Sequence, residues 1–156
     1  MKKTVNIVLA GIGGQGVIKA SDILSEAAFT SGFDIKKSEI HGMSQRGGSV
    51  SSDVRFGTKV FSPTVPPGEA DFLVVLADDQ VEINLHHLKK GGKLISSKNI
   101  DASKLPDPKT LNIALLGTLS SFVDIPQENW EDAIIKLLPS RFTDMNITAF
   151  RTGRNQ

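Results

Sequence analysis

The feature that most constrains the fold is a glycine-rich turn, GIGGQG, at residues 11–16. It follows Val5-Asn-Ile-Val-Leu-Ala10, a short apolar run with β-branched residues that predicts a strand. After the turn, apolar or small residues recur at a helical period, and they are Val17, Ala20, Leu24, Ala27 and Ala28. A strand, a glycine loop and a helix in this order open an α/β fold. We therefore predict a Rossmann-like, mostly parallel sheet with helices on both faces.

The remaining residues supply further elements for one domain, 1–156, because the chain is long enough for a single core and not for two. Apolar patterning predicts strands at 34–40, 50–56, 72–77 and 93–96, with a short return strand at 60–61. Helices are predicted from Asp78 to a stop at Gly91, with Asp78 or Asp79 as the cap, and then at 112–123, 130–138 and 141–151.

Composition excludes several classes of function. Lys and Arg number 18 against 17 Asp and Glu, a net charge of +1, so we expect neither a nucleic-acid binder nor a membrane-surface binder. No apolar run approaches the ~20 residues that cross a bilayer. We interpret the amino-terminal apolar run as a strand and not a signal peptide, which predicts a cytoplasmic protein. The chain has no cysteine, which excludes disulfides, a thiol nucleophile and a cysteine-ligated iron–sulfur cluster.

The glycine loop fits the pattern G-x-G-x-x-G through Gly11, Gly13 and Gly16. Free N–H groups at the start of the following helix favour an anion. Three interpretations stay open: a tight turn without a ligand, a dinucleotide site, or a site for another phosphate-bearing molecule. A dinucleotide site needs an acidic residue at the end of the second strand, where Glu39 stands, but a long glycine-rich loop follows it.

That second loop, EIHGMSQRGGSV at 39–50, concentrates groups that hold ligands. Arg46 is a fixed cation with a planar fork of donors that suits carboxylate or phosphate. Gly47 and Gly48 let the backbone approach a ligand, and His41, Ser44 and Gln45 add hydrogen-bonding groups. Both loops follow strands at their carboxyl ends, so we expect them to be neighbours at one crevice.

Five segments of the chain together resemble the γ-type domain of 2-oxoacid:ferredoxin oxidoreductases. They are GIGGQG, E-x-HGMSQRGGSV, SPTVPPGEADFLVV, NIALLG and MNITAFRTG, in this order. The HGMSQRGGSV segment is most similar to the β-type subunit of the indolepyruvate-oxidising members. The resemblance extends from about residue 5 to residue 153.

The resemblance implies a subunit of an enzyme that oxidatively decarboxylates a 2-oxoacid, here indolepyruvate or another aryl pyruvate. The products are an acyl-CoA and two electrons for ferredoxin. Thiamine diphosphate and [4Fe–4S] clusters are expected on a partner α subunit, with coenzyme A as cosubstrate, in a hetero-oligomer. The implied binding residues are Gly11, Ile12, Gly13, Gly14, Gln15, Gly16, Glu39, His41, Gly42, Met43, Ser44, Gln45, Arg46, Gly47 and Gly48. No catalytic residue and no metal ligand is expected in this chain.

Two other functions stay open on the sequence. One is an NAD(P)-binding domain, which would rest on the glycine pattern and Glu39. The other is a structural module whose loops only meet a partner's surface. Asn112, at the start of NIALLG, is either a helix cap or a residue that faces the crevice.

Overall fold

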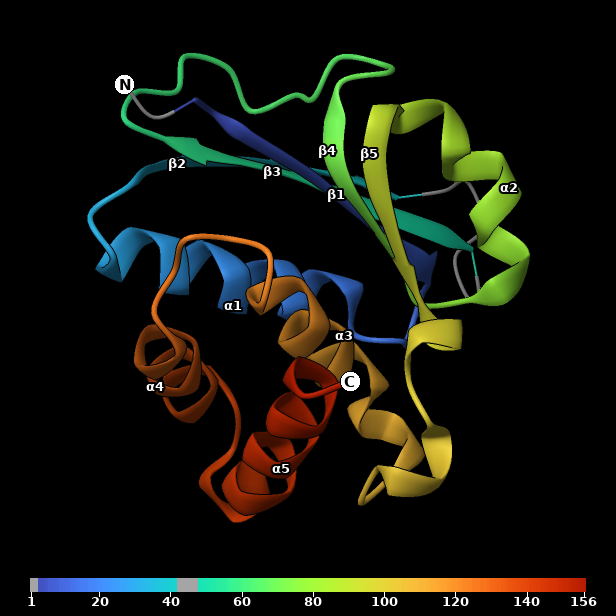
Figure 1. Cartoon of the computed structure of the whole chain (residues 1–156), viewed down its shortest axis with the longest axis vertical. Helices are drawn as coiled ribbons and strands as arrows, with labels where there is room; N and C mark the ends of the chain where they lie inside the picture. Colours follow the sequence, from blue (N-terminus) through green and yellow to red (C-terminus); the bar gives the residue numbers. More distant parts are fainter. Residues whose placement is uncertain (1–2, 42–47) are drawn as a thin grey trace.

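The computed structural model describes residues 3–41 and 48–156. Within them, one five-stranded sheet has the order β2-β3-β1-β4-β5 (Figure 1). Its strands are β1 (Val5–Ile12), β2 (Asp34–His41), β3 (Ser49–Gly57), β4 (Ala70–Val75) and β5 (Leu88–Ser96).

The α/β class is confirmed, but the sheet is mixed. Strand β1 pairs in parallel with β4, and β4 with β5, whereas β3 is antiparallel to both β1 and β2. Four strands therefore share one direction, and β3 alone runs against them. The reason is a hairpin: β2 and β3 pair along their whole length, from Asp34 with Gly57 to His41 with Val50. This hairpin places β3, and not β2, beside β1.

Four helices cover one face of the sheet (Figure 1). They are α1 (Val17–Thr30), α3 (Leu111–Ser120), α4 (Gln127–Leu137) and α5 (Thr143–Arg154). They bury the main core with Ile7, Leu9 and Val74 of the sheet. Trp130 is fully buried and packs against Phe150, with ring centroids 5.9 Å apart. No helix in the described part of the chain is long and apolar enough to span a bilayer.

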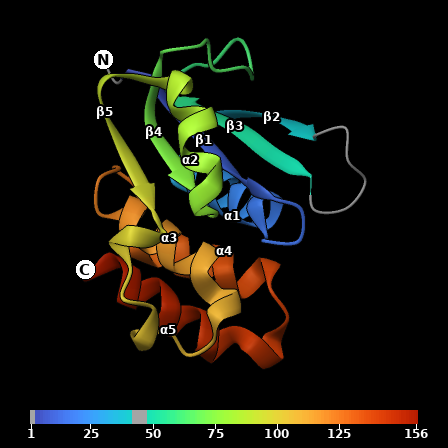
Figure 2. The ribbon, with the colours of Figure 1, turned by 90° about the vertical axis from the view of Figure 1, so that its right-hand side faces the viewer.

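The other face of the sheet is covered by the extended segment 58–69 and by α2 (Val81–Asn84), which lies in front of the sheet in Figure 2. Val65 and Val81 pack there against Val8, Leu73 and Val75. Short 3-10 turns, Asp78–Gln80 and Leu85–His87, flank α2.

The predicted helix from Asp78 to Gly91 is wrong in extent. Strand β5 begins at Leu88, because Leu88 pairs with Ala70 of β4 and the sheet takes the backbone groups that a longer helix would use. Neither Asp78 nor Asp79 is the cap, because the N-cap residues of the short turn and of α2 are Ala77 and Gln80. Asp78 instead accepts a hydrogen bond from the Ser97 hydroxyl. Residues 60–61 form no strand, and the Val60 N–H donates to an Asp34 carboxylate oxygen at 2.8 Å.

A buried carboxylate holds the segment 58–69 to β3. Asp53 is 5% exposed, and its Oδ2 accepts a hydrogen bond from the Val65 N–H at 2.9 Å. Burial raises the pKa of Asp53, and the bond from Val65 opposes that rise. Burial also shifts the pKa of nearby His87, and because the charged form of histidine is the protonated one, the shift is downward. This polar contact therefore belongs to the covering of the outer face.

Helices α3 and α5 cross with their backbones in contact. A Cβ added at Gly117 would lie 2.0 Å from the Phe150 carbonyl oxygen, and one added at Gly153 would lie 1.7 Å from the Ala114 carbonyl oxygen. The Thr118 hydroxyl donates to the Gly153 carbonyl at 3.0 Å. The final glycines of NIALLG and MNITAFRTG therefore permit this close crossing.

Candidate functional site

The glycine loop between β1 and α1 is a turn that only glycine accommodates at two positions. Gly14 has φ +92° and Gly16 has φ +81°, the left-handed region that L-residues avoid. The loop closes on itself through Gln15. The Gln15 N–H donates to the Ile12 carbonyl at 3.1 Å, and the Gln15 side-chain oxygen accepts from the Ile12 N–H at 2.8 Å. Gln15, predicted as a ligand-binding residue, therefore uses its carboxamide oxygen to shape the loop.

Helix α1 opens directly from this loop without a side-chain cap. Gly16 is the N-cap residue, and its carbonyl accepts from the Ala20 N–H at 3.0 Å. The first turn has no acidic residue and carries Lys19. The N–H groups of a helix's first turn have no partners within the helix, and with the helix dipole they favour an anion. The start of α1 therefore offers positive charge.

The second loop adjoins the first at the same edge of the sheet. His41 pairs with Val50, and Val50 pairs with Gly11, so the ends of β2 and β1 lie in one row across β3. The Gly13 N–H donates to the Gly48 carbonyl at 2.8 Å, which ties the end of the second loop to the first. The other predicted residues of this loop lie outside the described residues: Gly42, Met43, Ser44, Gln45, Arg46 and Gly47.

Two hollows flank the glycine loop, and each includes a lysine. One has a volume of about 390 Å³ and lies between the loop and the start of α3, with Leu76, Lys109 and Asn112 in its wall. The other has a volume of about 400 Å³ and lies between the loop and the second loop, with Lys19 and His41 in its wall. Both volumes fall in the range of small-molecule sites.

Sequence reasoning missed Lys19, Leu76 and Lys109. Lys19 carried a signal, since it falls in the first turn of the predicted helix. Lys109 carried none, because it belongs to a polar, proline-containing stretch that only the fold brings to the glycine loop.

Asn112 faces the glycine loop and does not cap α3, whose N-cap residue is Thr110. The Asn112 side-chain amide donates to the Gly16 carbonyl at 3.2 Å, across 96 residues of sequence. Of the two predictions for this residue, the structure supports the one that turns it toward the crevice.

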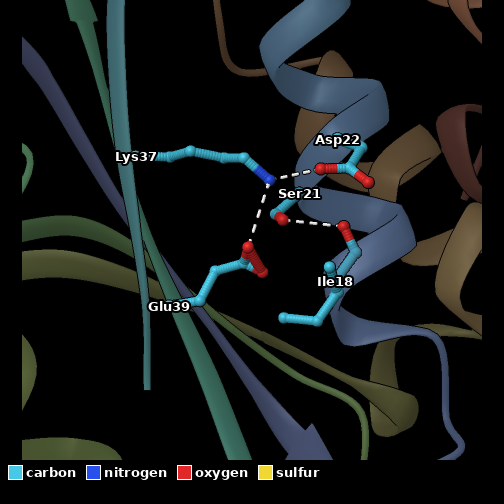
Figure 3. A network of polar contacts seen from close by, with 5 residues as sticks. All are labelled: Ile18, Ser21, Asp22, Lys37 and Glu39. Carbon is cyan, nitrogen blue, oxygen red and sulfur yellow. Dashed lines mark hydrogen bonds and ion pairs between the residues drawn. The ribbon is translucent and has the colours of Figure 1, made fainter. Parts of the chain in front are cut away.

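Glu39 is engaged by a lysine of its own strand. Its carboxylate lies 3.6 Å from the Lys37 ammonium, which also forms an ion pair with Asp22 of α1 (Figure 3). A dinucleotide site also needs β2 beside β1, so that an acidic residue at the end of β2 reaches the ribose. Here β3 occupies that place and runs in the opposite direction. Both observations count against a dinucleotide.

The described residues hold no group of three or more His, Cys, Asp or Glu side chains that suits a metal ion. The adjacent His86 and His87 stack on each other, with ring centroids 4.1 Å apart. The groups that line the two hollows at the glycine loop include backbone, lysine, histidine and carboxamide groups.

Comparison with known proteins identifies the family. Residues 6–156 match the family model described as pyruvate ferredoxin/flavodoxin oxidoreductase, and the chain belongs to this family. A relative from Thermococcus kodakarensis, indolepyruvate oxidoreductase subunit IorB, is 32% identical, and the match covers 97% of this chain and 95% of the relative. That alignment spans 193 positions, more than the 156 residues of this chain, so the relative has segments within the matched region that this chain lacks.

Solved structures show the same fold. The γ subunit of a keto/oxoacid ferredoxin oxidoreductase from Geobacter sulfurreducens has a TM-score of 0.82 at 24% identity, with 98% of this chain and 95% of that chain covered. A 2-oxoglutarate:ferredoxin oxidoreductase from Magnetococcus marinus has a TM-score of 0.80 at 19% identity, and the match covers 99% of this chain and 31% of that one. Its structure contains 2-oxoglutarate, coenzyme A and succinyl-CoA.

Proposed function

We propose that this chain is the non-thiamine-binding subunit of a cytoplasmic 2-oxoacid:ferredoxin oxidoreductase that acts on indolepyruvate or a related aryl pyruvate. The complex converts the 2-oxoacid and CoA into an acyl-CoA and CO₂, and two electrons pass to ferredoxin. The observation that carries the proposal is the family match over residues 6–156, together with the relative named for indolepyruvate.

The proposed division of labour within this complex comes from the resemblance to the family, and the composition of the chain agrees with it for the clusters. The absence of cysteine leaves no thiolate for an iron–sulfur cluster. The resemblance to the family assigns thiamine diphosphate and the [4Fe–4S] clusters to an α subunit, where they supply the decarboxylation and the electron transfer. This chain contributes binding surface, and the isolated chain is expected to be inactive.

Within this proposal, the two adjoining loops form the coenzyme A side of the reaction. Residues Gly11–Gly16 form one wall with the first turn of α1 behind them, and Glu39 with His41–Gly48 form the opposite wall, where Arg46 supplies a cation. Support comes from the bond between Gly13 and Gly48, from Lys19 and Lys109 beside the loop, and from the volume of the two hollows. Phosphate groups are the part of coenzyme A that such a surface suits.

The first experiment tests the class of enzyme. The chain is co-expressed with the thiamine- and iron–sulfur-binding subunit from the same cell, and ferredoxin reduction is measured with indolepyruvate, pyruvate and 2-oxoglutarate. We expect reduction that depends on CoA and on both subunits, fastest with indolepyruvate. A chain that remains monomeric with the partner present, and instead binds NAD tightly in calorimetric titration, would overturn the proposal.

The second experiment separates coenzyme A binding from assembly. In the assembled complex, Arg46→Ala is expected to raise the KM for CoA more than tenfold, since a lost charged phosphate contact costs about 1.5–3 kcal/mol. Size-exclusion chromatography is expected to show an intact complex. If assembly weakens while the KM for CoA is unchanged, the loop serves as a structural contact only.

A further inference from the structure

We infer that Asn112 is a positioning residue that holds the glycine loop in its binding conformation from helix α3. The inference rests on the contacts of this one carboxamide with the loop and with the helix. Its consequence for coenzyme A rests on the proposed function.

The carboxamide of Asn112 is held at both ends. Its oxygen accepts from the Ile113 N–H at 2.9 Å, and its nitrogen donates to the Gly16 carbonyl at 3.2 Å. The two bonds fix which end is oxygen and which is nitrogen, since only the nitrogen donates. The helix behind it is rigid, because α3 is buried from Ile113 to Ser120. The side chain therefore transmits the position of α3 to the loop.

The direction of the Gly16 carbonyl decides which way the first N–H group of α1 points. In a trans peptide, the carbonyl and the next N–H point in opposite directions, so the Gly16 carbonyl sets the direction of the Val17 N–H. Ala20 and Asn112 both donate to this carbonyl. The Val17 N–H consequently points away from α3, on the amino-terminal side of α1.

The space beside Gly16 is filled by the same side chain. A Cβ at Gly16 would lie 2.4 Å from the Asn112 amide nitrogen. Asn112 and Gly16 thus fit each other in shape as well as by hydrogen bond. Both also line the hollow that contains Lys109, so a displaced Asn112 changes the wall of that hollow.

The test compares two variants, and each of them loses one hydrogen bond from a side-chain amide to a backbone carbonyl. Asn112→Ala removes the bond to Gly16. Asn146→Ala, the matched control, removes the bond from Asn146 of α5 to the Phe142 carbonyl, which is 3.0 Å long in the native protein. Asn146 is 8% exposed, and it lines none of the hollows at the glycine loop.

Amide hydrogen exchange by NMR on the full chain decides the inference. In Asn112→Ala we expect the amides of Gln15 and Ala20 to exchange about threefold to tenfold faster, the factor that one lost hydrogen bond produces. In Asn146→Ala these two amides are expected to match the native protein once both are corrected for global stability. Unchanged exchange of both amides in Asn112→Ala would overturn the inference.

Steady-state kinetics of the assembled complex then test the link to coenzyme A. We expect Asn112→Ala to raise the KM for CoA about threefold to tenfold, with kcat at saturating CoA retained, and Asn146→Ala to leave both unchanged. Asn112→Asp is expected to raise the KM further, because its carboxylate repels a phosphate. Faster loop exchange with an unchanged KM would support the positioning role and count against the proposed coenzyme A site.

Discussion

Gly14 of the glycine loop and the two glycines of the α3–α5 crossing stand in opposite surroundings. At the glycine loop, a Cβ on Gly14 would meet no atom within 4 Å, and what demands glycine is a φ of +92°. At the crossing of α3 and α5, Gly117 and Gly153 have ordinary helical backbones, and what demands glycine is a neighbouring backbone within 2.0 Å of any added Cβ.

The difference separates the loop that we propose for binding from the helix crossing that supports the fold. At Gly14, glycine permits a left-handed backbone in open space, whereas glycine in the crossing brings two backbones together and excludes everything else. The two regions are joined by α3, which carries Asn112 at its start and Gly117 in its middle. Substitutions that act on one region and spare the other therefore test the comparison.

The largest expected effect is at the crossing. Gly153→Ala places a methyl group against the Ala114 carbonyl, so the helices must separate and the core around Phe150 must open. We expect a loss of more than about 3 kcal/mol of unfolding free energy. Urea denaturation measures this. Most surface substitutions change the unfolding free energy by less than about 1 kcal/mol. If Gly153→Ala changes it by no more than that, this glycine is not needed for the close approach of the two helices.

A smaller effect is expected at Gly14 of the loop, and Gly32 at the other end of α1 serves as its matched control. Gly14 and Gly32 both have left-handed φ, +92° and +90°, and both have open space around them. Alanine at either position is expected to cost about 1 kcal/mol of stability. Only Gly14→Ala is expected to raise the KM for CoA in the assembled complex, because Gly32 lies at the far end of α1. Equal kinetics for both variants would remove the loop from the binding site.

The hydrogen bond by which Gln15 closes the loop is expected to contribute less to function than the backbone conformation at Gly14. Gln15→Ala removes the acceptor of the Ile12 N–H, and we expect a loss of about 0.5–1.5 kcal/mol, measured by urea denaturation. Gln15→Glu retains an acceptor oxygen at this position and serves as the control, with stability near that of the native chain. A Gln15→Glu variant as unstable as Gln15→Ala would show that the hydrogen bond contributes little.

The smallest effect is expected at an ion pair beside the crossing. The Arg151 guanidinium donates two hydrogen bonds to Glu131 at 2.7 and 2.9 Å, and it lowers the pKa of that carboxyl below its ordinary value of 4.5. A lowered folded-state pKa adds stability above pH 4.5, and this stability is lost as the pH falls through the folded-state pKa. Arg151→Ala is expected to reduce this pH dependence. Thermal melts between pH 3 and 7, a window around the ordinary Glu pKa, check this.

Much of the fold was predictable from local pattern. The first strand, the glycine loop and α1 were placed correctly because the apolar period changes abruptly at Gly11 and Gly16. The predicted strand at 50–56 was likewise correct, as β3. The sequence failed between Asp78 and Leu88, since a short helical pattern there competes with strand pairing to Ala70, and pairing with a distant segment leaves no local trace.

One part of the candidate site was likewise predictable from the sequence, and another part was not. Its glycine loop and the second loop are each recognisable from consecutive residues, and their adjacency was expected from the carboxyl ends of two strands. The contributions of Lys109 and Asn112 depend on a segment almost a hundred residues further along the chain. No periodicity connects that segment to the loop, and the NIALLG segment left Asn112 open between a helix cap and a residue that faces the crevice.

The sequence by itself determined the α/β class, the family-typical loops and the lack of any cysteine to hold a cluster, because these follow from composition and from short-range pattern. Only the tertiary structure decided that β3 lies beside β1, that Gly117 and Gly153 bring two helices into backbone contact, and that Asn112 meets Gly16. Those features arise from packing between distant segments, where the stabilising contact depends on which surfaces the whole chain buries together.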